Sequence, residues 1–304
     1  MRRRRGQRPA TAAAGGAGVR IAKVVARAGL CSRREAERWI TQGRVSVNGE
    51  VLASPARDVV AGDRILVDGK ELPAPEPPRL WRYHKPRGLV TTHADPQGRP
   101  TVFDALPEHL PRVVSVGRLD VNTEGLLLLT NDGALARHLE LPATGWLRRY
   151  RVRAHGTVTQ EALDPLKEGV EIGGVRYGPV EATLDKVQGS NVWLTVALRE
   201  GKNREVRTIL DHLGLKVTRL IRVSFGPFQL RDLEPRGVEP VKRRVLVDQL
   251  GARVAAELGL AHEVAAGGET GVGGDTDRPG NTPEDRPGRA ANRRRVGGDA
   301  ARKA

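Results

Sequence analysis

Cysteine is nearly absent from this chain of 304 residues, which contains Cys31 alone. A single thiol can form neither an intrachain disulfide nor a cluster of thiolate metal ligands, and so small a cysteine content is typical of the reducing cytosol. The seven histidines show no His-x-x-x-His pair or other ligand spacing. The sequence therefore predicts a cytoplasmic protein without a metal site.

Long apolar segments are also missing. No stretch reaches the roughly 20 apolar residues that span a bilayer, and no strongly amphipathic basic helix stands out that would bind a membrane surface. The basic opening, residues 1–18, is not followed by the apolar core of a signal peptide. We therefore expect neither membrane insertion nor secretion.

Acidic residues are in deficit. The chain has 36 Asp and Glu against 51 Lys and Arg, a formal net charge of +15. Such a surface favours a polyanionic partner. Nucleic acid fits best, because contacts with phosphates release counterions before any base sequence is read.

The strongest functional signal is the seventeen-residue string 117–133, GRLDVNTEGLLLLTNDG. A short apolar segment, 113–116, leads into it. The apolar run 126–130 predicts a strand that is covered on both faces, and the turn at 131–133 leads into a helix over 134–139. This pattern predicts that Asp120 is presented where a strand ends and a turn begins.

These residues resemble the signature of the bacterial ribosomal RNA pseudouridine synthases of the RsuA/RluB/RluE/RluF family. A lone Asp at such a place would more often cap a turn, but the length of the string makes the resemblance specific. Two further blocks match in the same order, at 85–101 and 198–207, and the resemblance covers about residues 20–250. It implies that the chain isomerises uridine to pseudouridine in ribosomal RNA, with Asp120 as nucleophile and with no metal or organic cofactor.

The resemblance implies roles for five more residues. Tyr150 would stack on the target base and help to remove its C5 proton, with a half-buried strand tyrosine as the less favoured interpretation. Arg207, at the margin of the apolar stripe of a helix that Asn203 is expected to cap, would orient the nucleophile and keep it ionised. The residues expected to hold the RNA are Arg118, Lys202 and Arg204.

Residues 19–70 resemble the small α-L RNA-binding domain first named from a ribosomal protein. A short helix ends at Gly29, Ser32 and Glu35 form a capping box for a second helix, and a hairpin turn follows at 48–49. Basic side chains on the two helices would contact RNA phosphates. The alternative is that these side chains only form a solvated, charged face of a helix. The expected contact residues are Arg33, Arg34 and Arg38, joined from later loops by Lys85, Arg87 and Arg99.

The composition predicts the domain boundaries. We expect disordered basic arms at 1–18 and 262–304, a proline-rich linker at 71–79 and a catalytic domain at 80–255. The fold class is α+β: the small RNA-binding domain is joined to a mixed, mainly antiparallel sheet of pseudouridine-synthase type.

Several alternatives stay open. The resemblance favours large-subunit (23S) rRNA as substrate, with small-subunit (16S) rRNA as the alternative. A non-catalytic RNA-binding assembly factor and an N-glycosylase that releases uracil are less favoured classes. The sequence does not choose between addition of the aspartate to C1′ and removal of the C2′ proton to give a glycal. We expect a monomer that acts on free rRNA or on pre-ribosomal particles.

Overall fold

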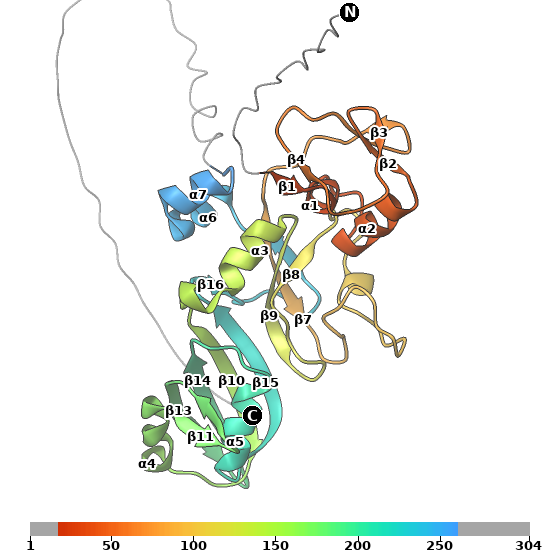
Figure 1. The fold of residues 1–304 in the computed structure, drawn as a ribbon. Helices are drawn as coiled ribbons and strands as arrows, with labels where there is room; N and C mark the ends of the chain where they lie inside the picture. Colours follow the sequence, from red (N-terminus) through yellow and green to blue (C-terminus); the bar gives the residue numbers. More distant parts are fainter. Residues whose placement is uncertain (1–17, 261–304) are drawn as a thin grey trace, which may run out of the picture. The chain divides into compact units, whose positions relative to one another are not determined.

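The computed structural model describes residues 18–260 (Figure 1). The two predicted basic arms lie outside the described residues, except for Gly18. None of the helices in the described range is long and apolar enough to cross a membrane.

The N-terminal part pairs two helices with short strands. The Ser32 hydroxyl accepts a hydrogen bond from the Glu35 N–H at 3.1 Å, which confirms Ser32 as the cap of the second helix. The small core is formed by side chains such as Ile21, Ile40 and Val47. The elements are β1 (Val19–Arg20), α1 (Ile21–Arg27), α2 (Arg33–Thr41), β2 (Val45–Val47), β3 (Glu50–Val51), β4 (Asp58–Val59), β5 (Ile65–Val67) and β6 (Lys70–Glu71).

The rest of the chain is built on one nine-stranded sheet. Its main path runs β13-β14-β10-β15-β9-β7-β17, with β16 paired to β15 and β8 paired to β9. The β9–β15 pair is parallel and every other pair in this sheet is antiparallel, which confirms the expected mixed, mainly antiparallel architecture. The strands are β7 (Leu80–Lys85), β8 (Val114–Val116), β9 (Glu124–Thr130), β10 (Arg148–His155), β13 (Val180–Gln188), β14 (Asn191–Leu198), β15 (Lys216–Phe225), β16 (Phe228–Gln229) and β17 (Val238–Pro240).

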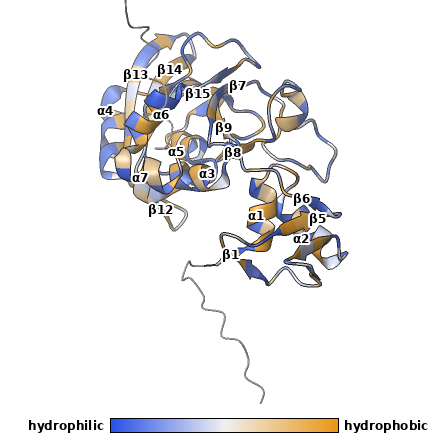
Figure 2. Cartoon of the chain, turned by 90° about the horizontal axis from the view of Figure 1, so that it is seen from above, coloured by the Kyte–Doolittle hydropathy of each residue, from blue (hydrophilic) through white to orange (hydrophobic). Residues whose placement is uncertain are grey.

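Helices and one small hairpin complete this part. Figure 2 shows both hydrophobic and hydrophilic stretches in the helices and strands, as expected of elements with one buried and one exposed side. The remaining elements are α3 (Gly133–Glu140), α4 (Gln160–Leu163), α5 (Glu205–His212), α6 (Arg243–Leu250), α7 (Ala252–Glu257), the hairpin β11 (Val170–Ile172) and β12 (Val175–Tyr177), and the 3₁₀ turns η1 (Phe103–Ala105), η2 (Pro142–Thr144) and η3 (Asp164–Glu168).

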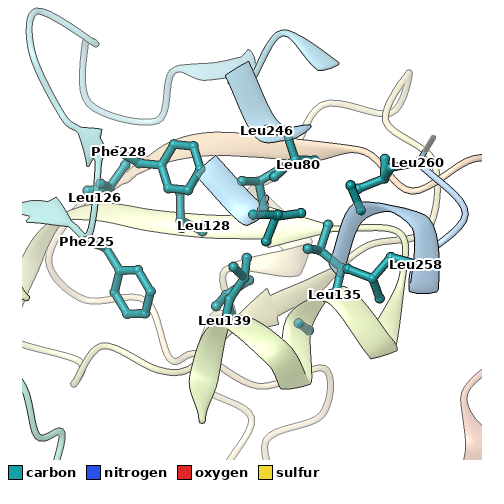
Figure 3. Packing of buried hydrophobic residues seen from close by; sticks show 14 of the residues in the cluster. Leu80, Leu126, Leu128, Leu135, Leu139, Phe225, Phe228, Leu246, Leu258 and Leu260 are labelled. Carbon is teal, nitrogen blue, oxygen red and sulfur yellow. The ribbon is translucent and has the colours of Figure 1, made fainter. Parts of the chain in front are cut away.

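Strand β9 is buried on both faces, as its apolar run predicts. Leu126 and Leu128 pack into one core with side chains of α3, α6 and α7 (Figure 3). Leu127 and Leu129 point the other way, into a second core. The strand that follows the Asp120 loop is therefore fixed from both sides.

Glycine is required where β9 pairs with β15. Gly125 has a φ of +102°, and a Cβ atom at this position would lie 2.3 Å from the carbonyl oxygen of Arg222. Only a residue without a side chain allows the two strands to approach so closely with this backbone conformation. The pairing places the start of β9 beside the middle of β15.

We expect Gly125→Ala to lower the free energy of unfolding by about 2–4 kcal/mol, because the added methyl group strains the backbone and separates β9 from β15. The matched control is Gly133→Ala at the start of α3. An added Cβ atom at Gly133 would meet no other atom within 4 Å, and the φ of this glycine is not positive. The control should therefore change stability by no more than about 1 kcal/mol. Urea unfolding measures the free energy of unfolding of both variants. Equal losses of stability in Gly125→Ala and Gly133→Ala would contradict the requirement for glycine at position 125.

Candidate active site

A cleft of about 1300 Å³ opens beside the nine-stranded sheet. It is lined by the β8–β9 loop, by parts of β10 and β15, and by the loop before α5. Seven of the predicted site residues line it, namely Arg34, Arg38, Arg118, Asp120, Tyr150, Lys202 and Arg204. The candidate nucleophile and the candidate stacking tyrosine therefore share one cleft.

Asp120 lies on the loop between β8 and β9, with its side chain 36% exposed. The loop is fixed by its backbone: the Thr91 hydroxyl donates to the Leu119 carbonyl at 2.8 Å, and the Gly88 N–H donates to the Val121 carbonyl at 2.8 Å. The Glu140 carboxylate accepts a hydrogen bond from the Gly117 N–H at 2.7 Å. The carboxylate of Asp120 is thus accessible while its backbone is held.

Lys85 lies beneath this loop. Its ammonium group is fully buried and donates to the carbonyl oxygens of Pro86 (3.0 Å), Asp120 (3.2 Å), Val121 (3.4 Å) and Thr123 (3.0 Å). Burial lowers the pKa of Lys85 to about 8, against the opposing attraction of the Asp120 and Glu124 carboxylates. The prediction that Lys85 contacts an RNA phosphate is wrong, because the ammonium faces the protein interior.

Arg207 holds the same loop from the side of α5. Its guanidinium donates to the carbonyl oxygens of Asn122 and Val217, each at 3.1 Å. Burial lowers the pKa of Arg207, Arg204 lowers it further and the Asp120 carboxylate raises it. In the part of the chain that the structure describes, no salt bridge joins Arg207 to Asp120. Arg207 therefore contacts the Asp120 loop through the backbone two residues further on.

The ion pair of Asp120 is formed by Arg204, whose Nη1 lies 4.0 Å from Oδ2 of the carboxylate. Arg204 has a φ of +52° and occupies the cap position of α5, which begins at Glu205. The expectation that Asn203 caps this helix is wrong. The Glu205 carboxylate instead reaches back to the Lys202 N–H at 2.9 Å, which closes the turn from inside the helix.

Tyr150 is half-buried on β10 and lies opposite Arg222 on β15. Arg222 is buried, and its Nε donates to the Leu126 carbonyl at 2.8 Å. Arg148, also buried, stacks over the ring of Phe225 with its Cζ 4.7 Å from the ring centroid. Burial lowers the pKa of both arginines, while their attraction to Tyr150 raises it. The tyrosine therefore lies between two inward-facing guanidinium groups.

Comparison with known proteins agrees with this geometry. The family model for RNA pseudouridylate synthase matches residues 79–212, and the model for the S4 domain matches residues 19–65. An uncharacterised RNA pseudouridine synthase of Rickettsia felis is 47% identical over 227 residues, which cover 75% of this chain and 98% of that protein. The chain belongs to the RNA pseudouridine synthase family.

Two further relatives extend the comparison. The ribosomal large subunit pseudouridine synthase B of Yersinia pestis is 44% identical over 229 residues, covering 72% of this chain and 71% of that protein. A crystal structure of a pseudouridylate synthase superposes with a TM-score of 0.53 at 28% identity, covering 77% of this chain and all of that one. As a member of this family the chain is an isomerase with an S4 RNA-binding domain.

Three of the other residues predicted to contact RNA lie close to acidic side chains of the protein itself. Arg99 pairs with Asp95 inside its own loop at 2.7 Å and, mainly through this hydrogen bond, holds the pKa of that carboxyl at about 2. The Lys202 ammonium is paired with Glu200 and also donates to the Arg176 carbonyl at 2.8 Å. The exposed Arg87 lies 4.0 Å from Glu124.

The remaining two predicted contacts are exposed arginines. Arg118 lines the cleft, whereas Arg33, on α2, does not. Across the described residues, no group of three or more His, Cys, Asp or Glu side chains is arranged to hold a metal ion.

Among the cleft residues that were not predicted from the sequence as site residues are the buried side chains of Arg148, Leu220 and Arg222. The available signal was an arginine at an inward position of a strand, where apolar residues are the rule. Arg222 follows Leu220 by two residues, so both side chains point to the same face of β15.

We expect Lys85→Met to lower kcat at least about 10-fold while KM changes little, because the loop carbonyls lose the ammonium donor that joins them and Asp120 loses its fixed position. Steady-state kinetics on an RNA substrate measures the effect. Lys167→Met, which removes an exposed lysine paired with Asp164, is the control and should retain full activity. A rise in KM with unchanged kcat would instead indicate an RNA contact.

Lys85 should also make stability depend on pH. Its pKa is about 8 in the folded chain against an ordinary 10.5, so the unfolded chain binds this proton more tightly. The free energy of unfolding should therefore rise between about pH 8 and 10.5, by up to about 1.4 kcal/mol per pH unit. Urea unfolding of the wild type and of Lys85→Met across this range isolates the contribution. If the free energy of unfolding changed with pH in the same way in both proteins, the lowered pKa of Lys85 would be contradicted.

Proposed function

We propose that the chain converts a uridine of large-subunit ribosomal RNA into pseudouridine, with Asp120 as the catalytic residue. The observation that carries this is the shared cleft of Asp120 and Tyr150, walled by cationic side chains. The name of the Yersinia pestis relative supports the large subunit as the source of the RNA.

The reaction requires the uridine to leave its stack, because no group of the protein can reach C1′ or the base faces inside a helix. Tyr150 offers an aromatic face to the everted base, a contact worth about 1–3 kcal/mol. The Asp120 carboxylate then adds to C1′ or takes the C2′ proton, and the C1′–N1 bond breaks with its electron pair leaving on the base. C5 of the retained uracil then attacks C1′: on the first route the bond between C1′ and the Asp120 carboxylate breaks and its electron pair returns to the carboxylate, and on the second Asp120 gives the proton back to C2′. Loss of the C5 proton and protonation of N1 complete the exchange.

Retention of the base is supported by the state of the other carboxylates in the cleft. Glu140 accepts from the Gly117 N–H, Glu200 pairs with Lys202, and Glu205 accepts from the Lys202 N–H. A glycosidase that hydrolyses its substrate uses a second carboxyl group as acid or base. Glu140 and Glu200 thus have structural partners and Glu205 is buried, whereas the Asp120 side chain is 36% exposed, which supports Asp120 as the reactive carboxylate.

Three guanidinium-bearing residues have supporting roles in this proposal. Arg204 pairs with Asp120 directly, and Arg207 fixes the loop that carries it. Arg118, exposed beside the nucleophile at the cleft, would hold the RNA strand from which the base has been displaced.

We expect Asp120→Asn to reduce turnover by on the order of 10⁴-fold or more, because an amide can neither add to C1′ nor take a proton. In cells that lack this gene, carbodiimide-blocked primer extension should show the loss of one pseudouridine from 23S rRNA. The wild-type gene should restore it and the Asp120→Asn gene should not.

Other results would point elsewhere. A site lost from 16S rRNA would move the substrate to the small subunit, and restoration by Asp120→Asn would indicate a non-catalytic assembly factor. Free uracil among the products of the purified protein would indicate an N-glycosylase. Each of these outcomes contradicts the proposal.

A further inference from the structure

Strand β10 has a second functional face. Arg149, Arg151 and Arg153 are exposed, whereas the intervening residues Tyr150 and Val152 are half-buried and buried. Because successive side chains of a strand point to opposite sides of the sheet, the three arginines lie on the side opposite to Tyr150. None of the three lines the cleft. We call this set, Arg149, Arg151 and Arg153, the arginine row.

Further cations flank the arginine row on the adjacent strands. Arg153 lies opposite Arg219 on β15, and His155 at the end of β10 lies opposite Lys216. On the other side Arg153 lies opposite Trp193 of β14, which in turn lies opposite Lys186 of β13. Lys186, Lys216 and Arg219 are all exposed.

Acidic side chains do not neutralise the arginine row. Among the described residues, no ion pair includes a member of the row. Glu124 is paired with Arg219 at 3.0 Å, and Asp185 accepts a hydrogen bond from the Thr195 hydroxyl at 2.9 Å. Glu181 lies on β13, two strands away from the row. The three guanidinium groups of the row therefore keep their full charge for an external partner.

One member of the row also has a contact that holds its side chain. The guanidinium of Arg151 stacks on the ring of Trp193, with Cζ 5.1 Å from the ring centroid. This contact fixes the guanidinium plane while its N–H groups remain free to bind an anion. Alternate residues of a strand are about 6.6 Å apart, so the row presents three evenly spaced cations in a line.

Like charges in a line without counter-ions do not stabilise the sheet. A polyanion with regularly spaced charges would offset their repulsion, and the backbone of RNA is one. The family substrate is RNA, and a structured rRNA extends well beyond the single nucleotide that the cleft can hold. Contacts to its phosphates fix position and add affinity without reading sequence.

We infer that the arginine row binds backbone phosphates of a second segment of the rRNA whose uridine enters the cleft on the opposite face. This inference rests on the proposed function only in taking rRNA as the substrate, and it does not depend on which uridine is modified. An acidic protein surface is the competing occupant, and the experiment below separates the two.

The test compares two variants of the full chain that lose the same charge. The first carries Arg149→Gln, Arg151→Gln and Arg153→Gln. The second removes three exposed arginines scattered over α3, β12 and α6, by Arg137→Gln, Arg176→Gln and Arg244→Gln. A third variant, with lysine at all three positions of the row, keeps the charge and checks that the strand still folds.

Filter binding to a 23S rRNA transcript is measured from about 50 to about 200 mM KCl. The row glutamine variant should bind about 10-fold more weakly at the upper salt concentration, with the slope of log K against log salt reduced by about 2, since each lost phosphate contact removes about 0.7. The scattered glutamine variant should stay within about 3-fold of the wild type. Equal weakening of both would overturn the inference, as would an unchanged slope.

Activity provides a second readout on the uridine mapped above. The row glutamine variant should retain its kcat/KM on a short hairpin that carries only this uridine and its stem, and show a raised KM on the long transcript. A loss of kcat/KM on the short hairpin would show that the row acts on the nucleotide in the cleft, and it would overturn the inference. Normal binding to the naked transcript but weak binding to ribosomal particles would assign the row to a protein partner. If no uridine is modified at all, the proposed function fails while the binding test still decides this inference.

Discussion

The buried ammonium of Lys85 holds the loop that carries the candidate nucleophile, Asp120. A charged amine without a carboxylate partner in direct contact is costly to bury, and here the cost is offset by four backbone carbonyl oxygens, three of which belong to the β8–β9 loop. Two of the loop carbonyls also accept a backbone N–H, that of Asp120 from Thr123 and that of Val121 from Gly88, so Lys85 adds a second donor to each. Lys85 and the loop therefore satisfy each other, and the Asp120 side chain is left free to face the cleft.

A second constraint brings the remaining site residues to this loop. The parallel pairing of β9 with β15, which requires glycine at position 125, sets the distance between the strand after Asp120 and the strand that carries Arg222. Strand β15 in turn pairs with β10 and so determines where Tyr150 lies. Three segments distant in sequence thus meet at one cleft because the sheet order, rather than any local motif, places them side by side.

The sequence was sufficient for features that arise from local patterns, such as the doubly buried run of β9, the alternation in β10 and the motif around Asp120. Residues whose environment is made by distant segments were not predictable in the same way. The loop carbonyls around Lys85 lie 35 to 38 residues further along the chain, so this lysine reads as one more exposed cation. The resemblance assigns Arg207 to Asp120 and Arg204 to the RNA, whereas in the structure Arg204, with its left-handed backbone, pairs with the carboxylate and Arg207 binds carbonyls. Arg222 was overlooked because its role lies in its burial, which depends on other strands.

Strand β10 shows how the fold separates the cations that line the cleft from those that are exposed on the opposite face. Its period of two sends Arg148 and Tyr150 to the cleft face and the arginine row to the opposite face, so one eight-residue strand supplies both the proposed base-stacking group and a cationic row. The two sets experience opposite environments: burial lowers the pKa of Arg148, whereas the row remains in contact with water. A basic strand in an RNA-modifying enzyme is therefore better understood as two interleaved surfaces than as one charged segment, and substitutions at adjacent positions should affect different parts of the same RNA.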